Sequence, residues 1–288
     1  MRVHSILRSA VLATSVLAAG SFASAQEAAA PAAGAQTPPQ AEHSPAPPME
    51  PRAVDILKAM GQRLAGARSL SFTAVATFER TSAFGHVLQY ASKYEVTLQR
   101  PNKLRVVTLG DGPRSEFYYD GKTIAQLAPV ENLVATAAAP ATIDAMLSSA
   151  FEAADIYFPF TDFLVADPFA DLAAGMELAF YIGPSVVVDG TKTDMLAFES
   201  HGVFIQTWVG ADDKLPRRAR AQFDSDPWQL RHEVSLSNWK LDPVVAADTF
   251  VSKQVASAKR IEFAKKEALP PGAAPLSDTL KAKQDQKP

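Results

Sequence analysis

Three histidines are the first residues in this 288-residue sequence to consider for metal or acid–base chemistry. His86, His201 and His232 are far apart in the sequence. None belongs to an HExxH or HxH pattern that would bring two imidazoles onto one metal ion. The chain has no cysteine, which excludes thiolate ligands, thiol nucleophiles and disulfides. The sequence therefore predicts neither a metal site nor a cofactor.

Two pairs of aspartates have the residue type that general acid–base catalysis requires. Asp212 adjoins Asp213, and Asp224 is followed two positions later by Asp226. Both pairs fall at predicted turns, where aspartate is favoured because its side chain bonds to the nearby backbone. The sequence also has no GxSxG pattern and no P-loop. We therefore expect a protein that is not an enzyme.

A cluster of positive charge follows the first of these turns. Arg217, Arg218 and Arg220 begin a predicted strand, in which Arg218 and Arg220 share one face and Arg217 points to the other. One interpretation is a solvated hairpin. The other is that Arg218 and Arg220 contact an anionic headgroup or the acidic edge of a partner protein. The sequence leaves both interpretations open.

The N-terminal segment has the pattern of a secretory signal peptide over residues 1–25. Arg2 and Arg8 precede a short apolar run, and the Ala-Ser-Ala at residues 23–25 is a small-residue cleavage pattern. The apolar run is too short to cross ~30 Å of hydrocarbon. We therefore expect an exported, periplasmic protein without stable membrane insertion. Its net charge of −3 gives no basic footprint for binding nucleic acid.

Two segments next to the predicted domain have compositions that bury little apolar surface. Residues 26–51 are rich in alanine and proline, and residues 264–288 contain prolines, lysines and other polar residues. Such compositions predict a disordered linker and a disordered tail. The expected folded domain is therefore residues 52–263, and we expect it to be a monomer.

Strand patterns dominate this domain after one predicted helix at residues 52–67. Residues 86–100 alternate apolar and polar side chains most clearly, which indicates a strand with one buried and one wet face. Similar short runs, separated by turns, extend over residues 71–136 and 177–239. The last elements that we expect are a hairpin of residues 185–188 with 193–200, a strand over 228–239, and one helical turn within 243–249.

Two helices and an aromatic connector interrupt the strands. Residues 142–154 have a helical apolar stripe, and Asp167-Pro168 predicts the start of a second helix that Gly175 ends. The connector between them is either a lid or a loop packed permanently on the sheet. Its aromatic residues are Tyr157, Phe158, Phe160 and Phe163. The whole pattern predicts a mainly β protein with helices (α+β), built on one curved antiparallel sheet of about ten or eleven strands.

Five segments together resemble a known family. They are RPNKLRV at 100–106, EFYYDGKTI at 116–124, ADPFADL at 166–172, LPRRARAQF at 215–223 and SNWKLDP at 237–243. In this order and spacing they resemble the predicted periplasmic proteins called domain of unknown function 2092, over about residues 53–263. That family is similar to the lipoprotein-carrier superfamily of LolA, LolB and RseB-type sensor domains.

The resemblance implies an incomplete antiparallel β-barrel whose mouth is closed by an N-terminal helix and a two-helix lid insertion. It also implies a cavity for acyl chains, although no local motif transfers a functional residue of the carriers to this chain. A half-barrel with an apolar face is independently suited to one apolar ligand, because each buried methylene contributes ~0.8 kcal/mol.

We therefore expect a carrier or sensor whose partner is a lipid or the acyl chain of a lipoprotein. The alternative is a protein-interaction module that modulates an envelope regulator and has no ligand of its own. The aromatic residues expected to line the cavity, or else to fill an ordinary core, are Phe72, Phe78, Tyr90, Tyr94, Phe117, Tyr119, Phe198, Phe204 and Trp208.

Overall fold

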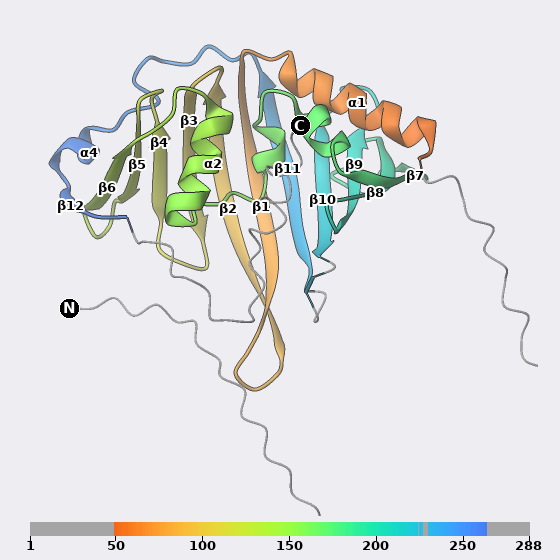
Figure 1. Ribbon diagram of the computed structural model, residues 1–288, viewed down its shortest axis with the longest axis horizontal. Helices are drawn as coiled ribbons and strands as arrows, with labels where there is room; N and C mark the ends of the chain where they lie inside the picture. The colour runs from red at the N-terminus through yellow and green to blue at the C-terminus, as the bar shows by residue number, and fades with distance from the viewer. Residues whose placement is uncertain (1–48, 224, 227–229, 264–288) are drawn as a thin grey trace, which may run out of the picture.

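A computed structural model describes residues 49–223, 225–226 and 230–263. The predicted signal peptide, nearly all of the predicted linker and the predicted tail lie outside the described residues. Within them the chain forms one sheet of 12 strands in the order β12-β6-β5-β4-β3-β2-β1-β11-β10-β9-β8-β7 (Figure 1). The sheet does not close, because β12 and β7 lie at opposite edges. This open, mainly antiparallel sheet confirms the predicted fold class.

The bounds of the elements follow the predicted pattern closely. The strands are β1 (Ser69–Thr81), β2 (Val87–Gln99), β3 (Lys103–Gly110), β4 (Ser115–Tyr119), β5 (Thr123–Ala128), β6 (Leu133–Ala138), β7 (Met176–Ser185), β8 (Thr193–Ser200), β9 (Val203–Gly210), β10 (Pro216–Phe223), β11 (His232–Leu241) and β12 (Lys259–Ile261). The helical elements are α1 (Pro51–Ala65), α2 (Ile143–Ala154), the 3-10 turn η1 (Thr161–Phe163), α3 (Pro168–Ala173) and α4 (Lys253–Ser257).

Alternation along the strands gives the sheet two different faces. We call the face that carries Phe72, Ala74 and Ala76 of β1 the inner face, and the opposite one the outer face. These three side chains are buried, and they lie opposite Val96, Tyr94 and Ser92 of β2 in the antiparallel register. Helices α1 and α2 lie on the same side of the sheet (Figure 1). The main core therefore lies between the inner face and these helices.

Helix α1 docks on the inner face at the β7 edge. Leu57, Met60 and Leu64 form its buried stripe. The Arg52 guanidinium lies 3.5 Å from the centre of the Tyr181 ring, and its Nη2 is 3.8 Å from a carboxylate oxygen of Asp194 on β8. Both apolar burial and these contacts fix the helix across β7 and β8.

Helix α3 lies against α1 because a glycine allows it to approach closely. A Cβ added at Gly61 would lie only 2.6 Å from the Cβ of Phe169 and 2.8 Å from the Phe169 backbone nitrogen. The predicted N-cap of α3 is confirmed, since the Ala170 N–H donates to the Asp167 carboxylate at 3.0 Å. The predicted stop at Gly175 also has a steric cause, because a Cβ there would meet the His201 ring.

Two predictions about the later elements were wrong. Residues 186–188 are not a strand; β7 itself continues to Ser185 and pairs with β8, and Val187 is 80% exposed beyond it. Residues 243–249 form no helix, whereas α4 and β12 were not predicted. Five helical and three strand residues are too few to show a periodic pattern. The predicted strand over 228–239 begins at His232, and residues 227–229 lie outside the described part.

The C-terminal elements cover part of the outer face. Strand β12 pairs in parallel with β6, and Ala258 packs against Tyr118, Leu127 and Val134. These side chains lie on the outer face of β4, β5 and β6. The outer face is therefore covered at the β12 edge, which distinguishes that region from the charged region over β1, β10 and β11 described below.

Candidate functional site

The aromatic connector, residues 157–163, packs onto the inner face of the sheet. Phe160 is 1% exposed, and its ring lies edge-on to Phe72 at 5.5 Å and to Tyr94 at 5.2 Å between ring centres. Phe158 stacks on Phe160 at 5.7 Å and meets Phe117 at 5.4 Å. The connector therefore fills the inner face with its own aromatic side chains, as a lid or a plug would.

The backbone of the connector is not paired with any described strand. Its hydrogen bonds run from Thr161 to Phe158, from Phe163 to Phe160 and from Leu164 to Thr161, all within residues 158–164. The connector is thus held on the sheet by side-chain packing, together with the contact described next.

Arg100 forms a hydrogen bond to the residue that follows the connector. Its Nη1 donates to the Leu164 carbonyl at 3.1 Å, while its buried Nε and Nη2 have no partner. Burial lowers the pKa of this guanidinium, and the Asp144 carboxylate opposes that effect. Asp144 also accepts from the Ala166 N–H at 3.1 Å, so both groups hold the segment that follows the connector.

An apolar surface on the inner face continues past the connector towards the β1–β2 turn. We call Phe78, Leu88, Tyr90 and His232 the inner strip. Phe78 stacks on Tyr90 at 5.7 Å, and His232 meets Phe223 edge-on at 5.1 Å. Leu88 is 45% exposed and Tyr90 is 38% exposed. The inner strip is thus an apolar surface that the helices and the connector leave uncovered.

His232 should make the stability of the domain depend on pH. Burial lowers the pKa of its imidazole, and the positive charge of Arg80 lowers it further, while Asp226 and Glu79 act in the opposite direction. The folded state therefore binds this proton less readily than the unfolded state. Stability present above the unfolded pKa of about 6.5 is lost as the pH falls through the folded value.

We expect His232→Gln to reduce the loss of melting temperature between about pH 7 and about pH 5. Thermal unfolding across this range measures the effect. The matched control is His86→Gln, because His86 is an exposed histidine at the end of the β1–β2 turn. An unchanged pH dependence in His232→Gln would show that the burial of His232 does not contribute to it.

The predicted lining residues fall into three groups. Phe72, Phe117, Tyr119 and Phe198 are fully buried on the inner face. Phe78, Tyr90 and Tyr94 lie on the same face and are partly exposed. Phe204 and Trp208 lie on the opposite face, so their prediction as lining residues was wrong.

Phe204 and Trp208 lie on the outer face. In the β9–β10 register they are opposite Gln222 and Arg218, whereas the buried Thr207 and Val209 point to the inner face. Neighbouring residues of a strand point to opposite faces, so these two aromatics cannot line the same surface as Phe72 and Tyr94.

Arg218 and Arg220 also lie on the outer face, where they are opposite Ser235 and Glu233 of β11. Arg218 Nη2 forms an ion pair with Glu233 at 2.6 Å, and its guanidinium lies 5.3 Å from the centre of the Trp208 ring. The whole sheet therefore separates these arginines from the inner strip. The headgroup of a lipid lying on the inner strip cannot rest on them.

The sequence did not indicate several residues that the fold brings into these surfaces. Trp239 stacks on Phe72 at 4.3 Å and donates through Nε1 to the Pro216 carbonyl at 2.9 Å. Arg231 pairs with Glu79 at 3.0 Å, although 152 residues separate them. The only signal available was that Glu79 and Arg231 lie near the ends of two predicted strands.

The described residues 49–223, 225–226 and 230–263 contain no group of three or more histidines or carboxylates placed to hold a metal ion. In this same part of the chain, no helix has the length and apolar composition that crossing a membrane requires. Asp213 of the predicted turn forms an ion pair with Arg217.

Together, the open antiparallel sheet and its helix-covered inner face define an α+β protein built on a single sheet. The sequence of residues 53–264 matches the family described as predicted periplasmic protein, domain of unknown function 2092. The chain therefore belongs to this family. The family predicted from the sequence is therefore confirmed, and its description agrees with the expected periplasmic location. No curated protein matches the chain.

Solved structures with a similar arrangement include MucB, at 19% sequence identity and a TM-score of 0.43, covering 77% of this chain and 70% of that chain. The MucA/MucB complex of Pseudomonas aeruginosa matches at 18% identity and a TM-score of 0.41, covering 77% and 68%. A LolA superfamily protein from Nitrosomonas europaea matches at 11% identity and a TM-score of 0.31, covering 69% and 97%.

Proposed function

We propose that this protein is a non-catalytic carrier or sensor that binds a lipid or acyl chain on the inner face of its sheet. The aromatic connector acts as the movable lid. One observation carries the proposal: the exposed rings of the inner strip continue, through Tyr94, into the aromatic cluster beneath Phe160. A chain lying on Tyr90 would therefore extend along a continuous apolar surface if the connector moved aside.

The energetics favour an apolar occupant over a polar one. Each methylene that leaves water contributes about 0.8 kcal/mol, so a chain covering Leu88 and Tyr90 gains from its first few carbons. Displacing Phe158 and Phe160 costs the connector its own burial, which the ligand then replaces. Such an exchange suits reversible loading. The apolar inner face is covered by the connector in the empty protein and by the ligand in the loaded protein.

Arg100 supports the assignment of the connector as a lid. Two of its guanidinium nitrogens are buried without partners while the connector is closed, an arrangement that costs free energy in a well-packed core. Moving the connector exposes this guanidinium to water, whose hydrogen bonds then satisfy the two nitrogens. The closed position is therefore held by aromatic packing and by the hydrogen bond from Arg100 to Leu164, and the two unpartnered nitrogens of Arg100 reduce its net stability.

Arg80 takes the headgroup role that Arg218 and Arg220 cannot have. It lies on β1 two residues beyond Phe78 and directly opposite Leu88, on the inner face, and its guanidinium is 5.5 Å from the centre of the Phe78 ring. An exposed cation at the end of an apolar strip favours a ligand with an anionic head and an apolar chain.

Two neighbouring residues of β2 test the proposal, because they point to opposite faces. Tyr90→Glu places a charge on the inner strip, whereas Gln89→Glu places the same charge on the outer face. We expect Tyr90→Glu to weaken binding of a fluorescent fatty acid by about tenfold or more, since burying a carboxylate against an acyl chain is costly. Gln89→Glu should bind the probe as the unchanged protein does.

The measurement is a fluorescence titration of the lipid-stripped protein. Equal weakening by both variants would indicate a general electrostatic effect and not contact with the inner strip. If the unchanged protein takes up no fatty-acid probe at all, the carrier assignment fails. The protein would then be interpreted as an interaction module without a ligand of its own.

A further inference from the structure

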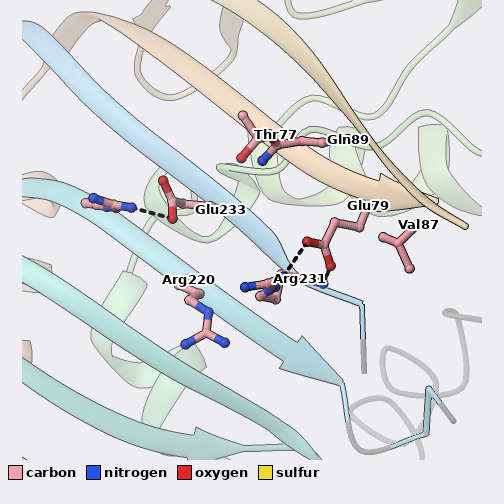
Figure 2. Close-up of a pocket in the computed structure, with 8 residues that line it drawn as sticks. Thr77, Glu79, Val87, Gln89, Arg220, Arg231 and Glu233 are labelled. Atoms are coloured by element: carbon pink, nitrogen blue, oxygen red, sulfur yellow. Dashed lines mark hydrogen bonds and ion pairs between the residues drawn. The ribbon is translucent and has the colours of Figure 1, made fainter. Parts of the chain in front are cut away.

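A pocket lies on the outer face of the sheet, over β1, β2, β10 and β11. It has a volume of about 490 Å³ and is open to solvent. Its lining is almost entirely polar, with a single aliphatic residue, and five of its eight side chains are charged. The lining residues are Thr77, Glu79, Val87, Gln89, Arg218, Arg220, Arg231 and Glu233 (Figure 2). We call it the outer pocket.

Four of the five charges in the outer pocket neutralise one another. Glu79 accepts from the Arg231 guanidinium at 3.0 Å and from the Arg231 backbone N–H at 3.0 Å, and this backbone bond is the main cause of its lowered pKa. Glu233 accepts from Arg218 at 2.6 Å. Both carboxylates are therefore already paired with an arginine.

Arg220 is the remaining charge. Among the described residues, its guanidinium makes no hydrogen bond or ion pair, although its charge contributes to the lowered pKa of Glu79. Figure 2 shows Arg220 beside the Arg231–Glu79 pair, with no interaction drawn to it. Arg218 adds a buried Nε without a partner. The outer pocket therefore has one net positive charge and unused donors on two guanidinium groups.

We infer that the outer pocket is a docking site for an acidic segment of a protein partner, with one carboxylate seated on Arg220. A planar guanidinium can donate two parallel N–H···O hydrogen bonds to the two oxygens of one carboxylate. The Thr77 hydroxyl and the Gln89 amide line the same pocket and can hydrogen-bond to a peptide backbone or a second polar side chain. One net charge balances one carboxylate.

The position of the outer pocket favours a protein over a lipid or a nucleic acid. The sheet separates it from the inner strip, and Val87 alone offers apolar contact, so acyl chains gain little there. Two glutamates among five charged groups repel a polyanionic backbone, and the chain as a whole is acidic. The site is also independent of the inner face, so a partner can dock whether or not that face is loaded.

The experiment uses the mature protein and a short, fluorescently labelled peptide that has blocked ends and a single glutamate, in a buffer of low ionic strength. We expect binding that Arg220→Gln weakens about tenfold or more, because a charge-assisted hydrogen-bonded pair is lost. Arg220→Lys should bind with intermediate affinity, since it keeps the charge but not the planar fork. The matched control is Arg63→Gln, which removes the same charge from the exposed side of α1 and should bind normally.

The two β2 variants separate this inference from the proposed function. Gln89→Glu should weaken peptide binding by adding a negative charge to the lining of the outer pocket, and Tyr90→Glu should leave it unchanged, the reverse of their effects on fatty-acid uptake. Inorganic phosphate and vesicles containing anionic lipid are titrated in parallel. The inference is overturned if the single-glutamate peptide does not bind the unchanged protein, if Arg63→Gln and Arg220→Gln are equally weakened, or if phosphate or the vesicles bind through Arg220 more tightly than the peptide.

Discussion

Replacing Phe160 with alanine is expected to lower the free energy of unfolding by about 3–5 kcal/mol and to increase the uptake of a fatty-acid probe. The first effect follows from burial, since Phe160 is 1% exposed and contacts Phe72, Tyr94 and Phe158. The second follows from the lid assignment, because removing the ring opens apolar volume on the inner face and leaves the backbone of the connector in place.

Chemical denaturation and probe titration of the same variant measure both effects. Tyr157→Ala is the matched control, because it removes an aromatic ring from the same connector at a position that is 55% exposed. It should cost less than Phe160→Ala, because the Tyr157 ring is far more exposed than that of Phe160. If Phe160→Ala loses stability but takes up no more probe, the connector is a permanent part of the core.

Replacing Gly61 with alanine should destabilise the protein by about 1–3 kcal/mol, although alanine is the better helix former by about 1 kcal/mol. The reason is steric. The new methyl group would lie 2.6 Å from the Cβ of Phe169 and 2.8 Å from its backbone nitrogen, and a backbone atom cannot rotate away. Helix α3 would have to move off α1, together with the end of the connector that precedes it.

Gly66→Ala is the control for this substitution. Gly66 follows α1 with φ −70°, an ordinary conformation for alanine, and the nearest atom to its new Cβ is a helix carbonyl at 3.2 Å. It should be neutral or should stabilise by about 0.4–1 kcal/mol, because the unfolded chain loses freedom. Equal destabilisation by both variants in thermal unfolding would contradict the close-packing argument.

Local patterns predicted most of the fold because their causes are local. The alternation in residues 86–100 defines β2, and the N-cap at Asp167 is determined by its own neighbours. The α1 stripe of Leu57, Met60 and Leu64 was likewise visible in the sequence, since helical spacing alone identifies it.

The division of residues between the two faces could not be predicted with the same success. In β9, Phe204 and Trp208 alternate with Ile205 and Val209, so both faces of the strand are apolar and the pattern does not say which one is inner. Pairing with β10 decides it, and that register depends on the assembled sheet. The Glu79–Arg231 pair of the outer pocket arises in the same way, from strands that are distant in sequence.

The central position of β1 has a consequence for how the chain reaches this structure. Strand β1 pairs on one side with β2, which follows it directly, and on the other with β11, so that Asn238 bonds to Thr73 across 165 residues. During synthesis, the first meander therefore forms with one side of a 13-residue strand unpaired until nearly the whole domain has appeared. Closing so distant a pair is slow, and an open strand edge invites pairing with other chains in the meantime. The time before β11 arrives is thus the interval in which a newly made chain most needs protection from its neighbours.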